Sequence, residues 1–260
     1  MSITTHNQPP KIKRNPRAKI PGGLTPIQRW EQKRNAVLLH LYRCHHSLPN
    51  MLADACGIEV GFPQELADKR GLLRRFDTPR LVAKHGWMLT EDGVATVMAE
   101  TGLVLNYDLD VGSVDHRLLR HDITVQRILN ALGVLSYEID KDLTFPYTVN
   151  VKHPDARAIL KNAERALIES ELTPKSGREL HRALLASAEA IANGLGERVM
   201  YFSQSETLLK NYKDAVRGQI PVWEFDRAAS RWKTTKSRKL SEATVAAFSF
   251  QHLPKLLQDI

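Results

Sequence analysis

Three acidic residues and a lysine are spaced along residues 152–175 so that a β-hairpin would gather them. Two stretches of alternating apolar and polar residues, joined by a polar turn at residues 161–163, predict that hairpin. A three-residue turn places Asp155 opposite Glu169, and Glu171 lies on the same face roughly 6–7 Å further along. Neighbouring carboxylates repel each other, and a divalent cation offsets that repulsion most simply. The spacing therefore predicts a Mg²⁺ or Mn²⁺ site on Asp155, Glu169 and Glu171, within reach of Lys175.

A site of this kind is suited to the cleavage of phosphodiesters. A bound metal ion polarises the scissile phosphate and lowers the pKa of the attacking water or hydroxyl. A lysine beside it stabilises the charge that develops on the phosphorus. We therefore predict that Asp155, Glu169, Glu171 and Lys175 are catalytic. The alternative is an ordinary amphipathic hairpin with a solvated acidic face.

The same residues resemble the core of the PD-(D/E)xK nucleases, with Pro154-Asp155 followed by Glu169-Ser170-Glu171 and then Lys175. The strings IESELTPKSGREL and RHDITVQRIL resemble the replication-relaxation family of plasmid and mobile-element proteins, which includes the MOBC-type conjugative relaxases. The resemblance implies an α/β (α+β) fold, with an N-terminal winged helix-turn-helix domain before a restriction-endonuclease-like domain that has a central mixed sheet. The chain departs from the pattern at Glu171, where a lysine is usual, and Lys175 would replace that lysine from a shifted position.

Composition narrows the class of partner. The chain has 260 residues, 42% of them hydrophobic, and a formal net charge of +8. That length suits one large domain or two small ones. The positive charge favours an anionic partner, nucleic acid first and an acidic membrane surface second. Cys44 and Cys56 imply no disulfide scaffold and fit no common zinc finger. Without an apolar run long enough for a signal peptide or a membrane span, the chain is expected to be cytoplasmic.

Residues 26–104 predict the first domain, in the order helix, helix, basic helix, two-stranded unit, helix. That order is typical of a winged helix, whose basic helix lies in the major groove while the wing contacts the flanking backbone. The alternative is a helical bundle with a solvated charged face. The predicted DNA-binding residues are Arg70, Arg74 and Arg75 on a helix within residues 63–82, and Lys84 and His85 on a wing within residues 81–90.

Residues 105–226 predict the second domain, in which a helix at 114–132 precedes three strands, a helix, a strand, a further helix and a short last strand. This mixture predicts a central sheet with a right-handed crossover. His121, on the opening helix, is expected beside the acidic hairpin, where it could orient DNA or move a proton. The alternative is that His121 only packs in a helix interface.

The two ends of the chain are basic. Residues 1–25 contain many prolines and glycines among their lysines and arginines, which predicts a disordered arm that contacts phosphates. In the tail, residues 227–260, the run Arg231-Trp232-Lys233 suits contact with single-stranded DNA or a phosphate backbone. Solvated segments without a specific task are the alternative at both ends. The last residues of the tail are expected to form a docking helix or a protein-interaction segment.

Two functions of different classes fit these features. The first is a site-specific, metal-dependent nicking endonuclease or relaxase for plasmid or mobile-element mobilisation. The second is a DNA-binding accessory protein or regulator with a degenerate nuclease-like domain. Both predict double-stranded DNA at a transfer origin or operator as partner, with single-stranded DNA, relaxosome or coupling proteins and a second copy of the chain as further candidates, and no membrane. A covalent route would need a tyrosine, and the sequence singles out none of Tyr137, Tyr147 and Tyr201.

Overall fold

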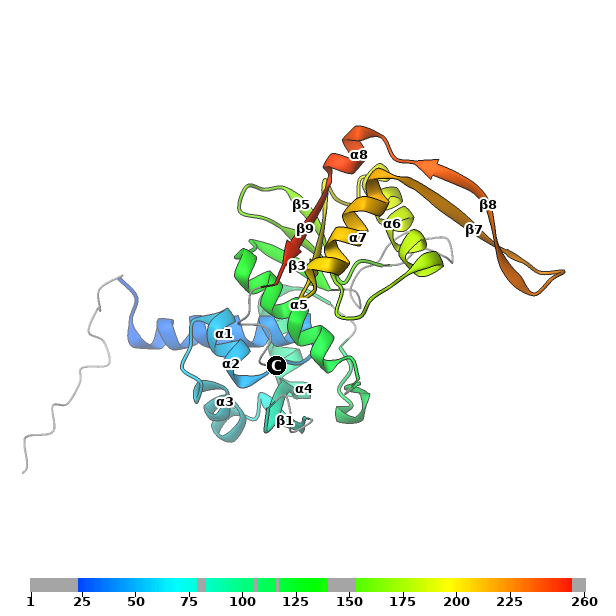
Figure 1. Ribbon diagram of the computed structural model, residues 1–260. Helices are drawn as coiled ribbons and strands as arrows, with labels where there is room; N and C mark the ends of the chain where they lie inside the picture. Colours follow the sequence, from blue (N-terminus) through cyan, green and yellow to red (C-terminus); the bar gives the residue numbers. More distant parts are fainter. Residues whose placement is uncertain (1–22, 79–82, 105–106, 116, 140–152, 254–260) are drawn as a thin grey trace, which may run out of the picture.

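A computed structural model describes residues 23–78, 83–104, 107–115, 117–139 and 153–253 of the chain (Figure 1). The described residues form a mixed α/β protein, as expected. Its N-terminal part contains α1 (Pro26–Cys44), α2 (Pro49–Cys56), α3 (Phe62–Arg70), β1 (Leu73–Asp77), β2 (His85–Leu89) and α4 (Glu91–Thr101). Its C-terminal part contains η1 (Val111–Ser113), α5 (Leu119–Leu132), β3 (Ser136–Ile139), β4 (Ala156–Ile159), β5 (Arg165–Ser170), α6 (Gly177–Ala192), β6 (Arg198–Ser203), α7 (Glu206–Arg217), β7 (Gln219–Asp226), β8 (Arg231–Lys239), α8 (Glu242–Ala246) and β9 (Phe248–His252).

The N-terminal part consists of helices packed around a short antiparallel ribbon. α1 begins where predicted because Thr25 and Gln28 form a capping box and Pro26 occupies the first turn. Strand β2 pairs with β1, and an isolated bridge joins Trp87 of β2 to Ser47. The core between α1, α3, α4 and the ribbon is formed by Val37, Leu38, Leu41, Tyr42, Leu66, Trp87, Leu89 and Val97.

The prediction of a helix through residues 63–82 was wrong. α3 ends at Arg70 because Gly71 takes a left-handed conformation with φ of 64°, which glycine adopts without steric cost. From Leu73 the apolar residues Leu73 and Phe76 are buried in a strand instead. Arg74 and Arg75 therefore lie on β1, and adjacent positions of a strand face opposite sides. The wing turn expected at residues 84–86 is also wrong, because His85 already begins the strand β2.

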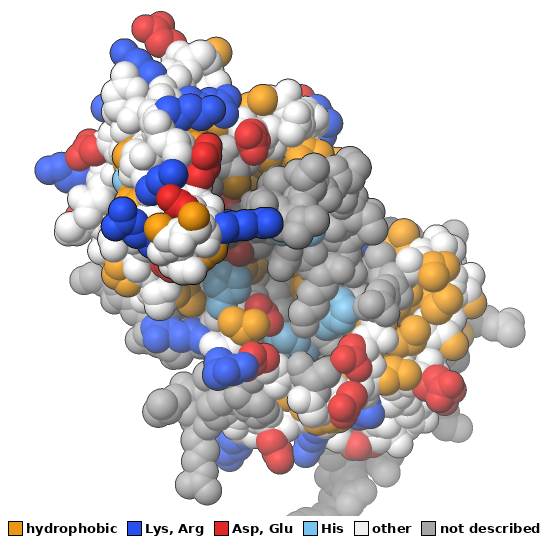
Figure 2. All heavy atoms as spheres, turned by 90° about the vertical axis from the view of Figure 1, so that its right-hand side faces the viewer, with side chains coloured by type: hydrophobic (Ala, Val, Ile, Leu, Met, Phe, Trp, Pro, Cys, Tyr) orange, Lys and Arg blue, Asp and Glu red, His pale blue; other side chains and the backbone are white. Residues whose placement is uncertain are grey.

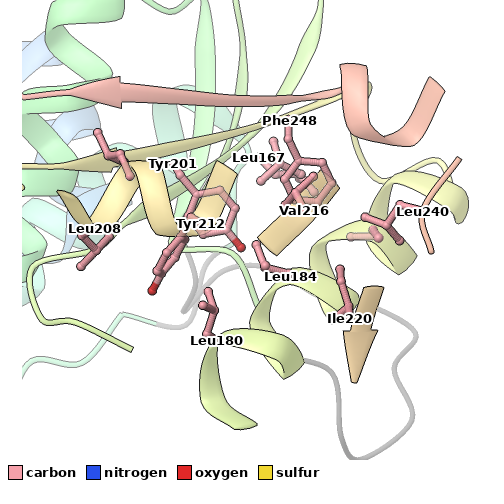
Figure 3. Packing of buried hydrophobic residues seen from close by; sticks show 14 residues of the cluster. Leu167, Leu180, Leu184, Tyr201, Leu208, Tyr212, Val216, Ile220, Leu240 and Phe248 are labelled. Carbon is pink, nitrogen blue, oxygen red and sulfur yellow. The ribbon is translucent and has the colours of Figure 1, made fainter. Parts of the chain in front are cut away.

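A five-stranded mixed sheet forms the centre of the C-terminal part, in the order β3-β4-β5-β6-β9. Strands β3, β4 and β5 are antiparallel, whereas β6 and β9 run parallel to their neighbours. α5 packs on one face against the alanines of β4 and Ile168. α6 and α7 cover the other face, where Leu167 and Tyr201 meet Leu180, Leu184 and Tyr212 (Figure 3).

The predicted hairpin and its register are confirmed. Ala156 pairs with Ile168 and Ile159 pairs with Arg165, so Asp155 falls opposite Glu169. The polar turn closes through a hydrogen bond from the Leu160 amide to the Glu164 carbonyl, 2.9 Å long. The opening helix is shorter than expected, because α5 begins at Leu119 and the 3₁₀ helix η1 precedes it.

The prediction of a basic tail after residue 226 was wrong. β8 pairs with β7 in a two-stranded ribbon that projects from the body of the molecule (Figure 1). β9 then joins the central sheet beside β6, and Phe248 and Phe250 stack on Tyr201. Within the segment that was expected to form a docking helix or an interaction segment, residues 242–246 form α8 and residues 248–252 form β9, whereas residues 254–260 lie outside the described residues. The second domain therefore extends well beyond its predicted end.

Candidate functional site

Asp155 lies at the open end of the hairpin, one residue before β4 begins. The Asp155 backbone amide donates to the Ile168 carbonyl at 3.0 Å. Its Oδ2 accepts a hydrogen bond of 2.6 Å from the Ser170 amide. Backbone donation of this kind stabilises the ionised carboxylate. Asp155 is thus held at the carboxyl end of β5, where the sequence predicted the site.

His121 of α5 lies against Asp155, as predicted. Its Nε2 is 3.2 Å from Asp155 Oδ2, and its Nδ1 is 3.4 Å from Asp122 Oδ1. The second oxygen of Asp122 is 3.5 Å from Nε2 of the buried His46, which follows α1. A chain His46–Asp122–His121–Asp155 therefore joins the N-terminal part to the hairpin through α5. The sequence predicts no role for His46 or Asp122; its one local signal is that an acid directly follows His121.

His121 is a cation at neutral pH. Burial by itself lowers the pKa of His121, but the hydrogen bonds to Asp122 and Asp155 and the charges of both carboxylates outweigh burial and raise it to about 10. An imidazolium cannot accept a proton, so His121 is not a general base in this state. It can donate a hydrogen bond and balance negative charge.

Glu171 and Lys175 form a separate pair. Both Glu169 and Glu171 are 2% exposed. The ammonium of Lys175 donates to both carboxylate oxygens of Glu171. A buried carboxylate needs such a partner, because charge removed from water without compensation is costly. Lys175 therefore neutralises Glu171.

The tyrosines near the sheet are held in their protonated form. Burial, together with the negative charges of Glu169 and Glu171, raises the pKa of both Tyr201 and Tyr212 above the usual value. The Tyr201 hydroxyl is fully buried and 2.9 Å from Ser187 Oγ. These features make Tyr201 a packing residue rather than a nucleophile.

Tyr137, on β3, belongs to the interface between the two parts. Its hydroxyl is 3.1 Å from His40 Nδ1 and 3.3 Å from Cys44 Sγ, and burial raises the pKa of Tyr137 well above its usual value. Tyr147 lies outside the described residues. None of Tyr137, Tyr201 and Tyr212 is therefore activated for covalent catalysis.

The described side chains do not fit the predicted metal centre as they are arranged. Over the ranges that the structure describes, no group of three His, Cys, Asp or Glu residues is placed to hold a metal ion. Asp155 contacts His121 on the face covered by α5, whereas Glu171 contacts Lys175 and lies near Tyr212, on the face covered by α7. Protein cations thus neutralise carboxylates that a metal ion was expected to bind, and we derive no step through Mg²⁺ or Mn²⁺.

A cavity of about 270 Å³ opens beside Asp155. It is bounded by the His121–Asp122 pair, by Cys44 and by apolar side chains of α5 and β3. The cavity is lined by Cys44, Leu118, His121, Asp122, Val125, Gln126, Ile139 and Asp155. Two carboxylates, an imidazolium and several apolar side chains therefore line the same cavity.

Three of the predicted DNA-binding residues gather on the β1–β2 ribbon. Arg75 and Lys84 are exposed, and burial together with their positive charges lowers the pKa of His85. The Arg75 guanidinium lies 5.3 Å from the centre of the Trp87 ring and bonds to Gln64 of α3. Arg75, Lys84 and His85 thus form one basic edge, which also carries the exposed Asp77 opposite His85.

The other two arginines predicted for the helix lie apart from this edge. Arg70, in the last turn of α3, lies 5.1 Å from the centre of the Trp30 ring of α1. Arg74 is half-buried on the strand face opposite Arg75.

The residues predicted in the tail lie on the second ribbon. Arg231 and Lys233 are exposed on β8, and Lys233 bonds to Asp226 at 3.1 Å. Trp232 is half-buried and contacts Phe225, with ring centres 5.5 Å apart. The ribbon projects away from α5 and the acidic hairpin (Figure 1), so the structure does not gather these residues with Asp155.

Comparisons with known proteins identify no relative of this chain. No protein-family model matches the chain, and no curated protein or solved structure is significantly similar to it. Within the described ranges, no helix combines the length and the apolar character that crossing a membrane requires.

Proposed function

We propose that the chain is a DNA-binding protein of the replication-relaxation type, with a winged-helix module followed by a PD-(D/E)xK-like module. The order α1-α2-α3-β1-β2-α4, with its bridge from Ser47 to Trp87, supports the first assignment. The order α5-β3-β4-β5-α6-β6, with an antiparallel meander and a parallel fourth strand, supports the second.

The single observation that carries DNA binding is the basic edge of Arg75, Lys84 and His85. In a winged helix this ribbon is the wing, which contacts the phosphate backbone beside the groove. Double-stranded DNA at a transfer origin or operator is the proposed partner. Relaxosome proteins or a second copy of the chain would assemble on the same DNA.

Of the two roles, a non-catalytic accessory or regulatory protein is supported better. Its support is the charge balance, because His121 lies against Asp155 and Lys175 neutralises Glu171. The second candidate is a nicking endonuclease of a mobile element that requires Mg²⁺ or Mn²⁺. The register that sets Asp155 opposite Glu169 favours this second candidate.

Binding assays test the proposed wing. Arg75→Ala/Lys84→Ala should weaken binding to duplex DNA and lower the salt slope of log K by about 2, because each lost phosphate contact lowers it by about 0.9. Lys210→Ala/Lys213→Ala, on the exposed side of α7, removes the same charge and should leave the slope unchanged. If both variants bind alike, the β1–β2 ribbon is not the wing of a DNA-binding module.

A supercoiled-plasmid assay separates the two roles. The plasmid should carry the mobile element's own transfer origin, with Mg²⁺ or Mn²⁺ present. For an accessory protein, wild type should bind the plasmid without producing open circles. Nicking by wild type that disappears in Asp155→Ala would instead establish the endonuclease.

A further inference from the structure

The ribbon of β7 and β8 concentrates positive charge that the proposed wing does not use. Residues 219–239 contain six basic side chains and two acidic ones, a net charge of +4 out of the chain's +8. Eight of the nine residues of β8 are exposed. Lys and Arg side chains gather over the upper part of the face seen in Figure 2, the side from which the ribbon projects in Figure 1.

The ribbon is anchored at its base. Ile220 and Leu240, at the two strands' inner ends, are buried in the core with α6 and α7 (Figure 3). Further out, Trp223 Nε1 donates to His181 Nδ1 of α6 at 3.1 Å. A two-stranded ribbon is marginally stable alone, so these contacts hold it as an arm in a defined direction.

Trp232 of this arm packs against two arginines of α6. The guanidinium groups of Arg178 and Arg182 lie 4.7 and 5.1 Å from the centre of the Trp232 ring. Phe225 meets the same ring with its edge. Trp232 therefore already has cation–π and aromatic partners, which makes it a fixed part of the arm rather than a stacking platform for bases.

Four basic side chains of the ribbon form no ion pair with any residue that the structure describes: Arg227, Arg231, Lys236 and Lys239. In contrast, Lys233 bonds to Asp226 and Arg238 lies 4.0 Å from Glu189. Unpaired, exposed cations break no existing pair when they bind phosphates, and counterion release then favours binding.

We propose that the β7–β8 ribbon is a second DNA-binding arm that enters the major groove of duplex DNA, where Arg227, Arg231 and Lys236 contact the phosphates. The major groove, about 12 Å wide, admits a two-stranded ribbon. Eight residues of strand span roughly 26 Å, long enough to lie along the groove past several base pairs. This inference rests on the proposed DNA binding and adds a contact surface separate from the β1–β2 edge.

Fluorescence anisotropy with labelled random-sequence DNA, as a duplex and as a single strand, tests the arm over a range of KCl concentrations. Arg227→Ala/Arg231→Ala/Lys236→Ala should weaken duplex binding about tenfold and lower the salt slope by about 2 to 3. The control Lys161→Ala/Lys210→Ala/Lys213→Ala removes the same charge from exposed positions off the ribbon and should bind like wild type. Thermal unfolding midpoints should agree among the three proteins, because every substituted side chain is exposed.

The outcomes distinguish a failure of the arm from a failure of the proposed function. If the ribbon variant binds the duplex like the control while Arg75→Ala/Lys84→Ala loses affinity, the arm is overturned and DNA binding by the wing stands. If the ribbon variant loses affinity for the single strand but not for the duplex, the groove-binding arm is overturned as well. If wild type binds neither DNA, the proposed function fails and the arm fails with it.

Discussion

Asp155 and Glu171 are each neutralised by a neighbouring side chain, and this determines whether they can bind a cation together. Asp155 is held by a backbone amide and a histidine, and Glu171 is held by Lys175. Each carboxylate is satisfied by a different partner on a different element. The residues of the expected nuclease site are therefore present without forming a shared cation site.

The pair of Glu171 and Lys175 predicts a stability effect. Lys175→Met should lower the free energy of unfolding by about 3 kcal/mol, because the carboxylate of Glu171 stays buried without its ammonium partner. Urea denaturation measures the loss. Glu171→Gln in the same chain should restore much of it, since the amide carries no charge. Equal stability of wild type and Lys175→Met would show that the pair contributes nothing.

His121 predicts a dependence of stability on pH. Its pKa is raised to about 10 in the folded protein, above the usual value near 6.5. Its stabilising contribution is therefore complete below pH of about 6.5 and is lost as the pH rises through about 10. The difference in unfolding free energy between wild type and His121→Gln should shrink over that interval. Denaturation curves recorded across it test this, and a difference that stays constant would contradict the raised pKa.

Among the elements, the β1–β2 ribbon depends on a close approach to the start of α4. The Leu72 carbonyl accepts a hydrogen bond from the Thr90 amide at 3.0 Å, and Thr90 caps α4 by accepting from the Gly93 amide. A Cβ at Gly93 would overlap that carbonyl oxygen. Glycine at this position keeps the ribbon and α4 together.

Gly93→Ala should consequently destabilise the protein, by about 1 to 3 kcal/mol, although alanine is the better helix former. The matched control is Gly61→Ala at the start of α3, where a Cβ meets nothing within 4 Å. That control should change stability by less than about 0.5 kcal/mol. Thermal or urea unfolding of both variants distinguishes a local clash from a general effect of glycine replacement.

At the scale of the whole molecule, α5 joins the two parts. Its first half, with Leu119 and Ile123, packs with Phe76 and Met88 of the N-terminal part. Its second half packs beneath the central sheet through Val125, Ile128 and Leu129. The N-terminal and C-terminal parts are therefore packed against one shared helix.

Gln126, in the middle of α5, ties this joint together. The buried side chain donates to the His46 carbonyl at 2.8 Å and accepts from Ser47 Oγ at 2.7 Å. Gln126→Leu should cost about 2 kcal/mol, because buried hydrogen-bonding groups lose their partner. Asn130→Leu, one turn along the same helix, is the control, since the side-chain amide of Asn130 forms no hydrogen bond with any described residue. Similar urea midpoints for the two variants would show that the hydrogen bonds of Gln126 do not stabilise the contact between α5 and the N-terminal part.

The local pattern of the chain determined the acidic hairpin. Period-two alternation and the polar turn specify which residues pair. The register of two strands joined by a short turn is set by the length of that turn and by the residues next to it. The sequence therefore predicted Asp155 opposite Glu169 correctly, together with α6, β6 and α7. Arg74 and Arg75 were misplaced because basic residues are compatible with both helix and strand, and the pairing of residues 73–77 with β2 decides between them.

Tertiary structure decided which partners Asp155 and Trp232 received, whereas Glu171 is paired with Lys175, only four residues along the chain. The contact of His121 with Asp155, the position of β9 beside β6 and the support of Trp232 by α6 all join residues far apart in the chain. Periodicity reports the face on which a side chain lies, but not which distant segment covers that face. The contact that balances the charge of Asp155 depends on that packing, so the sequence determined where the acids lie and the fold determined that His121 would reach Asp155.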